Sequence, residues 1–180
     1  MSDTITKPNI TAYPAPPAEA TPTDLKAEGA KAITAALNPL IATAFALYVK
    51  TKNFHWHLSG SHFREYHLML DEQADDIFES IDVIAERVRR IGGTTIRSIS
   101  HIASLQQIAD DNDEFVSPPQ MIRRLQEDNK NYTAQLRAAH QVCDDNKDVA
   151  STSFLEVIID QTERRTWFLY ETMRGGENEN

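Results

Sequence analysis

Cysteine is almost absent from this chain of 180 residues, in which Cys143 is the single example. One thiol cannot build an internal disulfide framework. The sequence therefore excludes the small disulfide-stapled folds and is typical of a reducing compartment. Cys143 also falls on the apolar stripe of its predicted helix, which favours a packed structural thiol over a reactive one.

The sequence also lacks the apolar segments of membrane and exported proteins. No run is expected to approach membrane-spanning length, and the first residues have no apolar signal core. We therefore expect a soluble, cytoplasmic protein. The length limits it to one domain that can bury a fair core.

Positive charge is scarce, because 18 Lys and Arg residues face 27 Asp and Glu residues, a net charge of −9 at pH 7. Such a balance argues against non-specific binding of polyanions by the body of the protein. Residues 1–21 supply no basic arm, since Lys7 is offset by Asp3 and Glu19, and residues 175–180 are acidic. Direct DNA binding is therefore disfavoured.

Composition divides the chain into three parts. Residues 1–21 are rich in Pro, Thr and Ala with almost no periodicity, which predicts a flexible tail. Residues 22–174 carry four long helical patterns, so we expect them to form one all-α domain. Residues 175–180 form a short acidic tail.

One long helix is the clearest structural prediction. Apolar residues recur every three or four positions over about eight turns, and Gly92-Gly93 ends the pattern. No proline or glycine interrupts this stripe. Its members are Phe63, Tyr66, Leu70, Ala74, Ile77, Ile81, Ile84, Val88 and Ile91.

The preceding helix is predicted from a capping signal at Thr21–Asp24, with Pro22 in its first turn. Asn38-Pro39 either restarts or kinks this helix, which ends by Gly60. His55 then lies near its end and can lean over the start of the long helix.

A long linker, from Thr94 to Val116, follows the central helix. Its apolar spacing predicts a short extra helix, from the positions Ile99, Ile102, Leu105 and Ile108. Ser117–Gln120 is a helix start with a capping box. Ile122, Leu125, Tyr132, Leu136, Ala139 and Cys143 mark the core face of this third helix. Asp144–Asp148 form a polar turn, and the fourth helix covers Ser151–Met173.

Four polar residues share one flank of the central helix. At about 100° per residue, Asp71 lies about 40° from His67, Asp82 about 60° and Glu86 about 100°. His67 and Asp71 are one turn apart, as are Asp82 and Glu86, so each pair can present two ligand atoms to one point. The alternative is a solvated flank with intrahelical pairs.

The two pairs cannot meet within one chain, because Asp71 and Asp82 are separated by about 16 Å of helical rise. A metal–ligand bond is about 2 Å. An antiparallel second copy, related by a two-fold axis near Asp76, would bring the pairs together in two equivalent sites. Imidazole plus carboxylates suits iron, manganese or zinc.

The same blocks resemble the Dps family, the miniferritins that protect DNA in starved bacteria. The matching segments are His55–Gly60 with Phe63, His67–Asp71, and Ile81–Arg87 followed by Gly92. A looser similarity extends from about Ala35 to Met173. The resemblance implies a ferritin-like four-helix subunit with a short extra helix in the linker between its second and third helices. It also implies a hollow dodecameric shell.

The resemblance further implies a ferroxidase at each two-fold interface. His55, His67 and Asp71 would come from one subunit, and Asp82 and Glu86 from its partner. The histidines would supply nitrogen, Asp71 and Asp82 oxygen, and Glu86 a tight or bridging carboxylate.

The activity implied is oxidation of Fe(II), by hydrogen peroxide in preference to dioxygen, with storage of Fe(III) mineral in the cavity. Zinc or another divalent metal is an alternative occupant. Trp56 would take up stray oxidising equivalents or merely pack. The setting implied is the bacterial cytoplasm, including its nucleoid.

Two acidic segments remain open to interpretation. Glu72, Asp75, Asp76 and Glu79 are either a solvated face or a surface that nucleates mineral. The resemblance places an iron-entry pore at Asp148, Ser153 and a third position near Glu156 or Val157. Asp144 and Asp145 are the alternative lining, or they belong to a solvated turn.

Two other functions are compatible with the sequence. One is a nucleoid-structuring DNA-binding protein with a secondary metal site, and the other is a helical bundle without metal. A di-iron site within one subunit would need Glu-x-x-His motifs, and none of the six histidines follows a glutamate at that spacing.

Overall fold

The computed structural model describes residues 21–174, so the predictions for the tails 1–20 and 175–180 lie outside the described residues. Within 21–174 the chain forms five helices and no strand, as the all-α prediction requires. Their bounds are α1 Ala27–His57, α2 Phe63–Arg90, α3 Ile99–Leu105, α4 Pro118–Asp145 and α5 Val149–Arg174.

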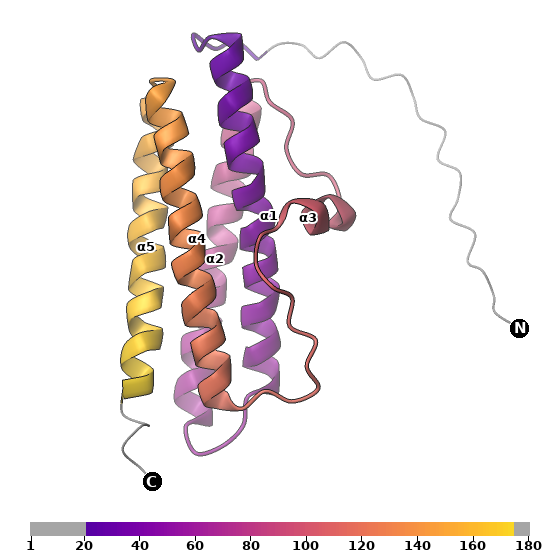
Figure 1. The fold of residues 1–180 in the computed structure, drawn as a ribbon, viewed down its shortest axis with the longest axis vertical. Coiled ribbons are helices and arrows are strands. Elements are labelled where there is room, and N and C mark those ends of the chain that lie inside the picture. The colour runs from indigo at the N-terminus through magenta and orange to yellow at the C-terminus, as the bar shows by residue number, and fades with distance from the viewer. Residues whose placement is uncertain (1–20, 175–180) are drawn as a thin grey trace, which may run out of the picture.

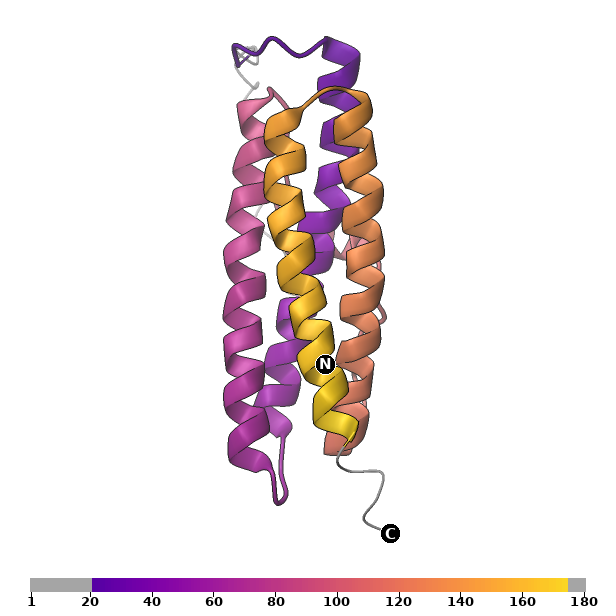
Figure 2. The ribbon, with the colours of Figure 1, turned by 90° about the vertical axis from the view of Figure 1, so that its left-hand side faces the viewer.

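Four long helices lie side by side along the long axis of the molecule, while the short α3 lies outside them beside α1 (Figure 1). α1 packs against α2, and α4 packs against α5, with further contacts of α1 to α4 and of α2 to α5. Figure 2 shows α5 in front, between α2 and α4. The fold is a four-helix bundle with one small added helix.

The linker between α2 and α4 is long for a topological reason. α2 and α4 run in the same direction, so the chain must return along the outside of the bundle, passing through α3 on the way (Figure 1). Single long crossovers of this kind occur in ferritin-like bundles. Polar groups hold the returning segment: the Lys50 ammonium donates to the Ala109 carbonyl at 3.0 Å, and Arg124 binds the carboxylate of Asp111 at 2.6 Å.

The apolar stripe of α2 is confirmed over most of its length. The side chains from Leu70 to Val88 in that stripe are buried in the core. Tyr66 is only partly buried, and Phe63 is 44% exposed, so its predicted place in the core is wrong. Phe63 stands at the first position of α2, before the helix meets the rest of the bundle.

The predicted start of α1 is also wrong. The N-cap is Lys26, which makes no side-chain capping bond, and Thr21–Asp24 lie before the helix. Pro39 does not restart the helix, because it lies inside the continuous α1. The Asn38 side chain instead reaches the linker and donates to the Thr94 carbonyl at 2.9 Å.

The expectation about apolar run length needs correction as well. α1 is long and apolar enough to cross a membrane by length and composition alone. A core helix of a soluble protein passes the same test, and α1 buries side chains along its whole length against the other helices. We therefore describe α1 as the core helix of the bundle.

α4 confirms its predicted start, because the Ser117 capping box with Gln120 is present and a proline occupies the first helical position. The predicted core face is buried throughout, and burial raises the pKa of Cys143 to about 11. Cys143 is thus the packed thiol that its position predicted. The helix continues through Asp145, and Lys147 makes the turn with a left-handed φ of 58°.

Asp148 is not the exposed pore residue that the resemblance implied. It is 3% exposed, accepts from the Ser151 amide at 3.1 Å, and forms an ion pair with Arg87. These contacts cap the start of α5 and tie it to the last turns of α2. Within one chain the Asp148 carboxylate therefore has a structural role.

Candidate metal centre

The centre is built at the corner where α1 turns into α2. Five residues join the two helices, so the last turn of α1 lies beside the first turns of α2. His55 enters the corner from α1 and is buried, while His67 enters from α2 and is partly buried. Their rings stack, with 3.7 Å between centroids and 21° between planes.

Both imidazole rings are fixed by the backbone of the opposite helix. The Nδ1 of His55 lies 2.9 Å from the His67 carbonyl, and the Nδ1 of His67 lies 3.1 Å from the His55 carbonyl. A carbonyl oxygen can only accept, so each Nδ1 carries the donated proton. In the neutral ring the Nε2 then keeps its lone pair, which is the form that binds metal.

Asp71 brings an oxygen to the same corner. Its Oδ1 lies 3.7 Å from Nε2 of His55, whose ring stacks on that of His67, so these contacts link the three residues in pairs. The Asp71 side chain remains 46% exposed, and solvent can therefore reach it.

Lys52 is the residue that spacing did not reveal. Its ammonium lies 2.5 Å from Oδ1 of Asp71, the same oxygen that faces His55. This hydrogen bond lowers the pKa of the Asp71 carboxyl and raises the pKa of the Lys52 ammonium. Lys52 precedes His55 by three residues, so a search of the same helical face for cations would have found it.

Asp82 and Glu86 form a separate, exposed pair on α2. Among residues 21–174, Glu86 pairs with the guanidinium of Arg90, one turn along the same helix, and both side chains are more than half exposed. A surface pair of this kind contributes little stability and is easily exchanged.

One chain does not complete a metal cage. Among residues 21–174, no three or more His, Cys, Asp or Glu side chains are grouped so that they could hold a metal ion. The bundle interior holds a cation instead: Arg165 is 3% exposed, and its Nε donates to Asn129 at 3.0 Å. Burial lowers the pKa of Arg165 to about 10. An interior guanidinium repels metal cations and leaves the surface flank as the candidate.

Several polar and aromatic residues around the corner are exposed. His57 and His62 are exposed, and Trp56 is 63% exposed beside His55. Three members of the acidic stripe, Glu72, Asp75 and Glu79, are exposed, and Asp76 is partly so. Their role in mineral nucleation stays a prediction.

Comparisons with known proteins agree with this fold. A family model described as a ferritin-like domain matches residues 34–177. A low-temperature-induced protein of Nostoc sp. is 31% identical over 77% of this chain and 78% of its own length. The DNA protection during starvation protein of Brevibacillus brevis is 31% identical over 74% of this chain and 89% of its own.

Among solved structures, DpsC from Streptomyces coelicolor matches with a TM-score of 0.82 at 26% identity, covering 84% of this chain and 89% of that one. The family match covers most of the sequence, so this is a ferritin-like protein. Together with the curated and structural relatives, it shows that the chain belongs to the Dps family.

Proposed function

We propose that this protein oxidises Fe(II) at sites shared between two antiparallel copies of α2. The observation that carries the proposal is the corner described above, where two imidazoles keep their Nε2 atoms free beside Asp71. The same flank of α2 carries Asp82 and Glu86 about 16 Å further on, where a two-fold axis would deliver them to the partner's histidines.

Fe(II) is the substrate, and the two halves suit it differently. The His55 and His67 nitrogens suit a borderline divalent ion, whereas the carboxylates of Asp71, Asp82 and Glu86 suit the harder Fe(III) product. Ligation that binds the product more strongly than the substrate favours loss of the electron. Zinc fits the same donors and is expected to compete with Fe(II).

The oxidant we propose is hydrogen peroxide. Two Fe(II) ions release two electrons, which with two protons reduce one peroxide to two waters. The oxygen–oxygen bond is then cleaved without release of a hydroxyl radical. This chemistry protects DNA without requiring contact with it, in keeping with the net charge of −9.

The assembly we propose is a hollow dodecamer that stores the Fe(III) as mineral in the bacterial cytoplasm. Two further inferences from the sequence belong to this proposal. Residues 22–174 would form the shell subunit, with 1–21 and 175–180 as tails. Asp144 and Asp145, which are exposed, would line the iron entry, because Asp148 is buried.

Complementation between two inactive variants tests the shared site. One variant is His67→Ala, which removes a nitrogen donor, and the other is Asp82→Asn with Glu86→Gln, which removes both acids. Each alone is expected to lose peroxide-driven Fe(II) oxidation, followed by absorbance, while keeping its assembled mass. Co-refolded at equal amounts, the two should regain about one quarter of the wild-type sites, because each site draws its halves from two chains.

The outcome of mixing distinguishes a site shared between two chains from a site within one chain. No recovery on mixing, with mixed assemblies confirmed by mass, would mean that each site lies within one chain. No acceleration over buffer by the wild-type protein would overturn the ferroxidase proposal itself. His57→Ala is the matched control, because this exposed imidazole also binds a carbonyl, that of Asn53 at 2.8 Å, yet lies outside the cluster.

A further inference from the structure

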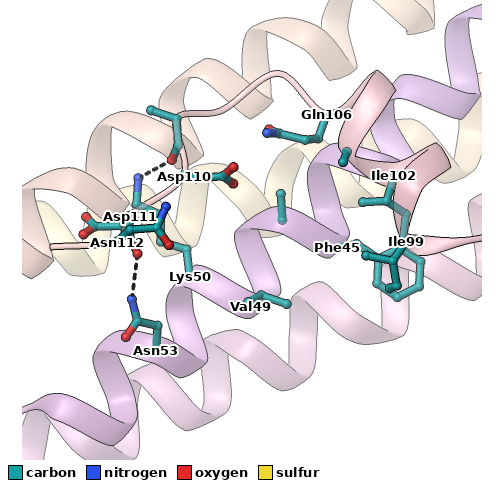
Figure 3. A pocket seen from close by; sticks show the side chains of 13 residues that line it. Phe45, Val49, Lys50, Asn53, Ile99, Ile102, Gln106, Asp110, Asp111 and Asn112 are labelled. Atoms are coloured by element: carbon teal, nitrogen blue, oxygen red, sulfur yellow. Dashed lines mark hydrogen bonds between the residues drawn. The ribbon is translucent and has the colours of Figure 1, made fainter. Parts of the chain in front are cut away.

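A cavity of about 320 Å³ lies between α1 and α3, and we call it the α3 cavity (Figure 3). Its volume is within the range of sites that bind small organic molecules. None of the residues of the metal corner lines it, so it is a separate site on the same chain. Its walls include Phe45 and Val49 of α1, Ile99 and Ala103 of α3, and Asp110 of the linker.

One side of the α3 cavity is apolar and open to solvent. Ile99 is 79% exposed and Val49 is 57% exposed, and no side chain of α3 is buried. In Figure 3 the Ile99 side chain lies beside Phe45 of α1. The aliphatic groups of α3 therefore gain little from folding onto α1 alone, whereas an apolar body placed between the two helices would remove this surface from water.

Hydrogen bonds fix the polar side of the cavity before any ligand binds. The Lys50 ammonium donates to the Ala109 carbonyl at 3.0 Å, and the side-chain amide of Asn53 donates to the Asp111 carbonyl at 3.3 Å (Figure 3). Both donors belong to α1, and both acceptors belong to the linker. Asp110 stands between the two anchored residues, so its backbone is held at the cavity while its side chain is exposed.

Asp110 carries the charge that is left uncompensated at the cavity. Three charged side chains line it, and two of them are already paired: Lys50 with Asp128 at 2.7 Å, and Asp111 with Arg124 at 2.6 Å. Among residues 21–174, Asp110 has no ion-pair partner. Figure 3 shows its carboxylate between the linker and α1. The cavity therefore attracts a positive head group and repels a negative one.

We propose that the α3 cavity binds a small organic amine. The aromatic or aliphatic body of the amine packs against Phe45, Val49 and Ile99, and its ammonium pairs with the Asp110 carboxylate. The body covers apolar surface that α3 leaves exposed, and the ammonium supplies the charge partner that Asp110 lacks. Binding does not require iron, because the residues of the metal corner take no part in it.

Three probes with one body and different head groups test the charge of the site. At neutral pH phenylbutylamine is a cation, phenylbutanol is neutral and phenylbutyrate is an anion. Equilibrium dialysis against the assembled, iron-free protein should show saturable binding of the amine, with one molecule bound per chain. The amine should bind about fivefold more tightly than the alcohol, a modest factor because the Asp110 carboxylate is exposed. The anion should bind more weakly than the alcohol.

Variants of the lining test the position of the site. Asp110→Asn should lower the affinity for the amine about fivefold and leave the affinity for the alcohol unchanged. Glu114→Gln is the matched control, because Glu114 is an exposed acid of the same linker that does not line the cavity. Ala103→Phe fills the cavity and should abolish binding of both probes. Its helix content by circular dichroism should match the wild type, because Ala103 is exposed.

Three results would each overturn the proposal. Equal affinity for the three probes would mean that the cavity does not select by charge. Undiminished binding to Ala103→Phe would place the ligand elsewhere on the protein. Absence of saturable binding to the assembled protein, as when a second copy of the chain covers the cavity, would mean that no free amine site exists there.

Discussion

The two halves of the candidate metal centre differ in how firmly they are held. His55 and His67 stack on each other, and each ring is fixed by a carbonyl of the opposite helix. Asp82 and Glu86 instead stand exposed on one helix, with Arg90 as the sole ion-pair partner of Glu86 among the described residues. The first half is pre-organised by folding, and the second is free to adjust.

This difference suggests that the two halves of the site have different roles. A rigid donor pair sets where an ion binds and loses little entropy when it does so. Flexible carboxylates can follow an ion whose radius and charge change on oxidation. Changes at the rigid half should therefore affect affinity strongly, whereas small changes around the acidic half should be tolerated.

The largest effect is expected from His67→Ala. The change removes a nitrogen donor and the ring that holds the His55 carbonyl, so both the ligand and its support are lost. We expect divalent metal affinity, measured by calorimetry with Co(II), to fall by about 100-fold or more. Retained affinity would show that the stacked pair is not a ligand set.

A smaller effect of opposite sign is expected from Lys52→Met. The ammonium competes with a metal for Oδ1 of Asp71, so its removal should strengthen Co(II) binding. Because Asp71 is nearly half exposed, solvent screening limits the gain to about fivefold, or about 1 kcal/mol. Lys52→Arg, which keeps the charge, is the control and should bind as the wild type does.

The pH dependence of the same pair gives an independent measurement. Lys52 lowers the pKa of Asp71 below 3.8, so the stability from this carboxylate is present above that value and lost as pH falls through the folded pKa. Asp71 raises the pKa of Lys52 above 10.5, so the stability from the ammonium is present below that value and lost as pH rises through the folded pKa. NMR titration of Asp71 in Lys52→Met should show its pKa moving up towards the ordinary value.

The smallest effect is expected from Arg90→Gln at the flexible half. This exposed pair, one turn apart, contributes only a few tenths of a kcal/mol. We expect Fe(II) oxidation to change by about twofold or less and the unfolding temperature to stay nearly constant. A large loss of oxidation would mean that Arg90 orients Glu86 and that this half is pre-organised too.

Much of the fold follows from local sequence. The period of α2 and the capping box at Ser117 depend on contacts within one helix, so both were predictable and both are present. The ligand flank of α2 follows from the same geometry, because a period of 3.6 residues fixes which side chains share a face.

The failures come from long-range contacts that compete with local signals. Thr21 resembles a helix cap, yet its hydroxyl donates to the Arg89 carbonyl at the end of α2, 3.2 Å away. Asp148 resembles a solvated turn residue, yet it is paired with Arg87. Spacing along α1 places Lys52 on the face of His55, but its contact with Asp71 depends on how α1 and α2 pair.

The reciprocal hydrogen bonds of His55 and His67 also bear on when a newly folded chain becomes able to react with iron. The last carbonyls of a helix have no partner within it, and the His67 ring supplies one for the end of α1. Closing the hairpin and choosing the metal-binding tautomer are thus a single event during folding. If the site is shared as proposed, a newly made monomer holds its two histidines in their final geometry but lacks the acids of a partner. Such a monomer is inert towards iron. Redox competence then appears with pairing, so the local concentration of the protein sets when the chemistry begins.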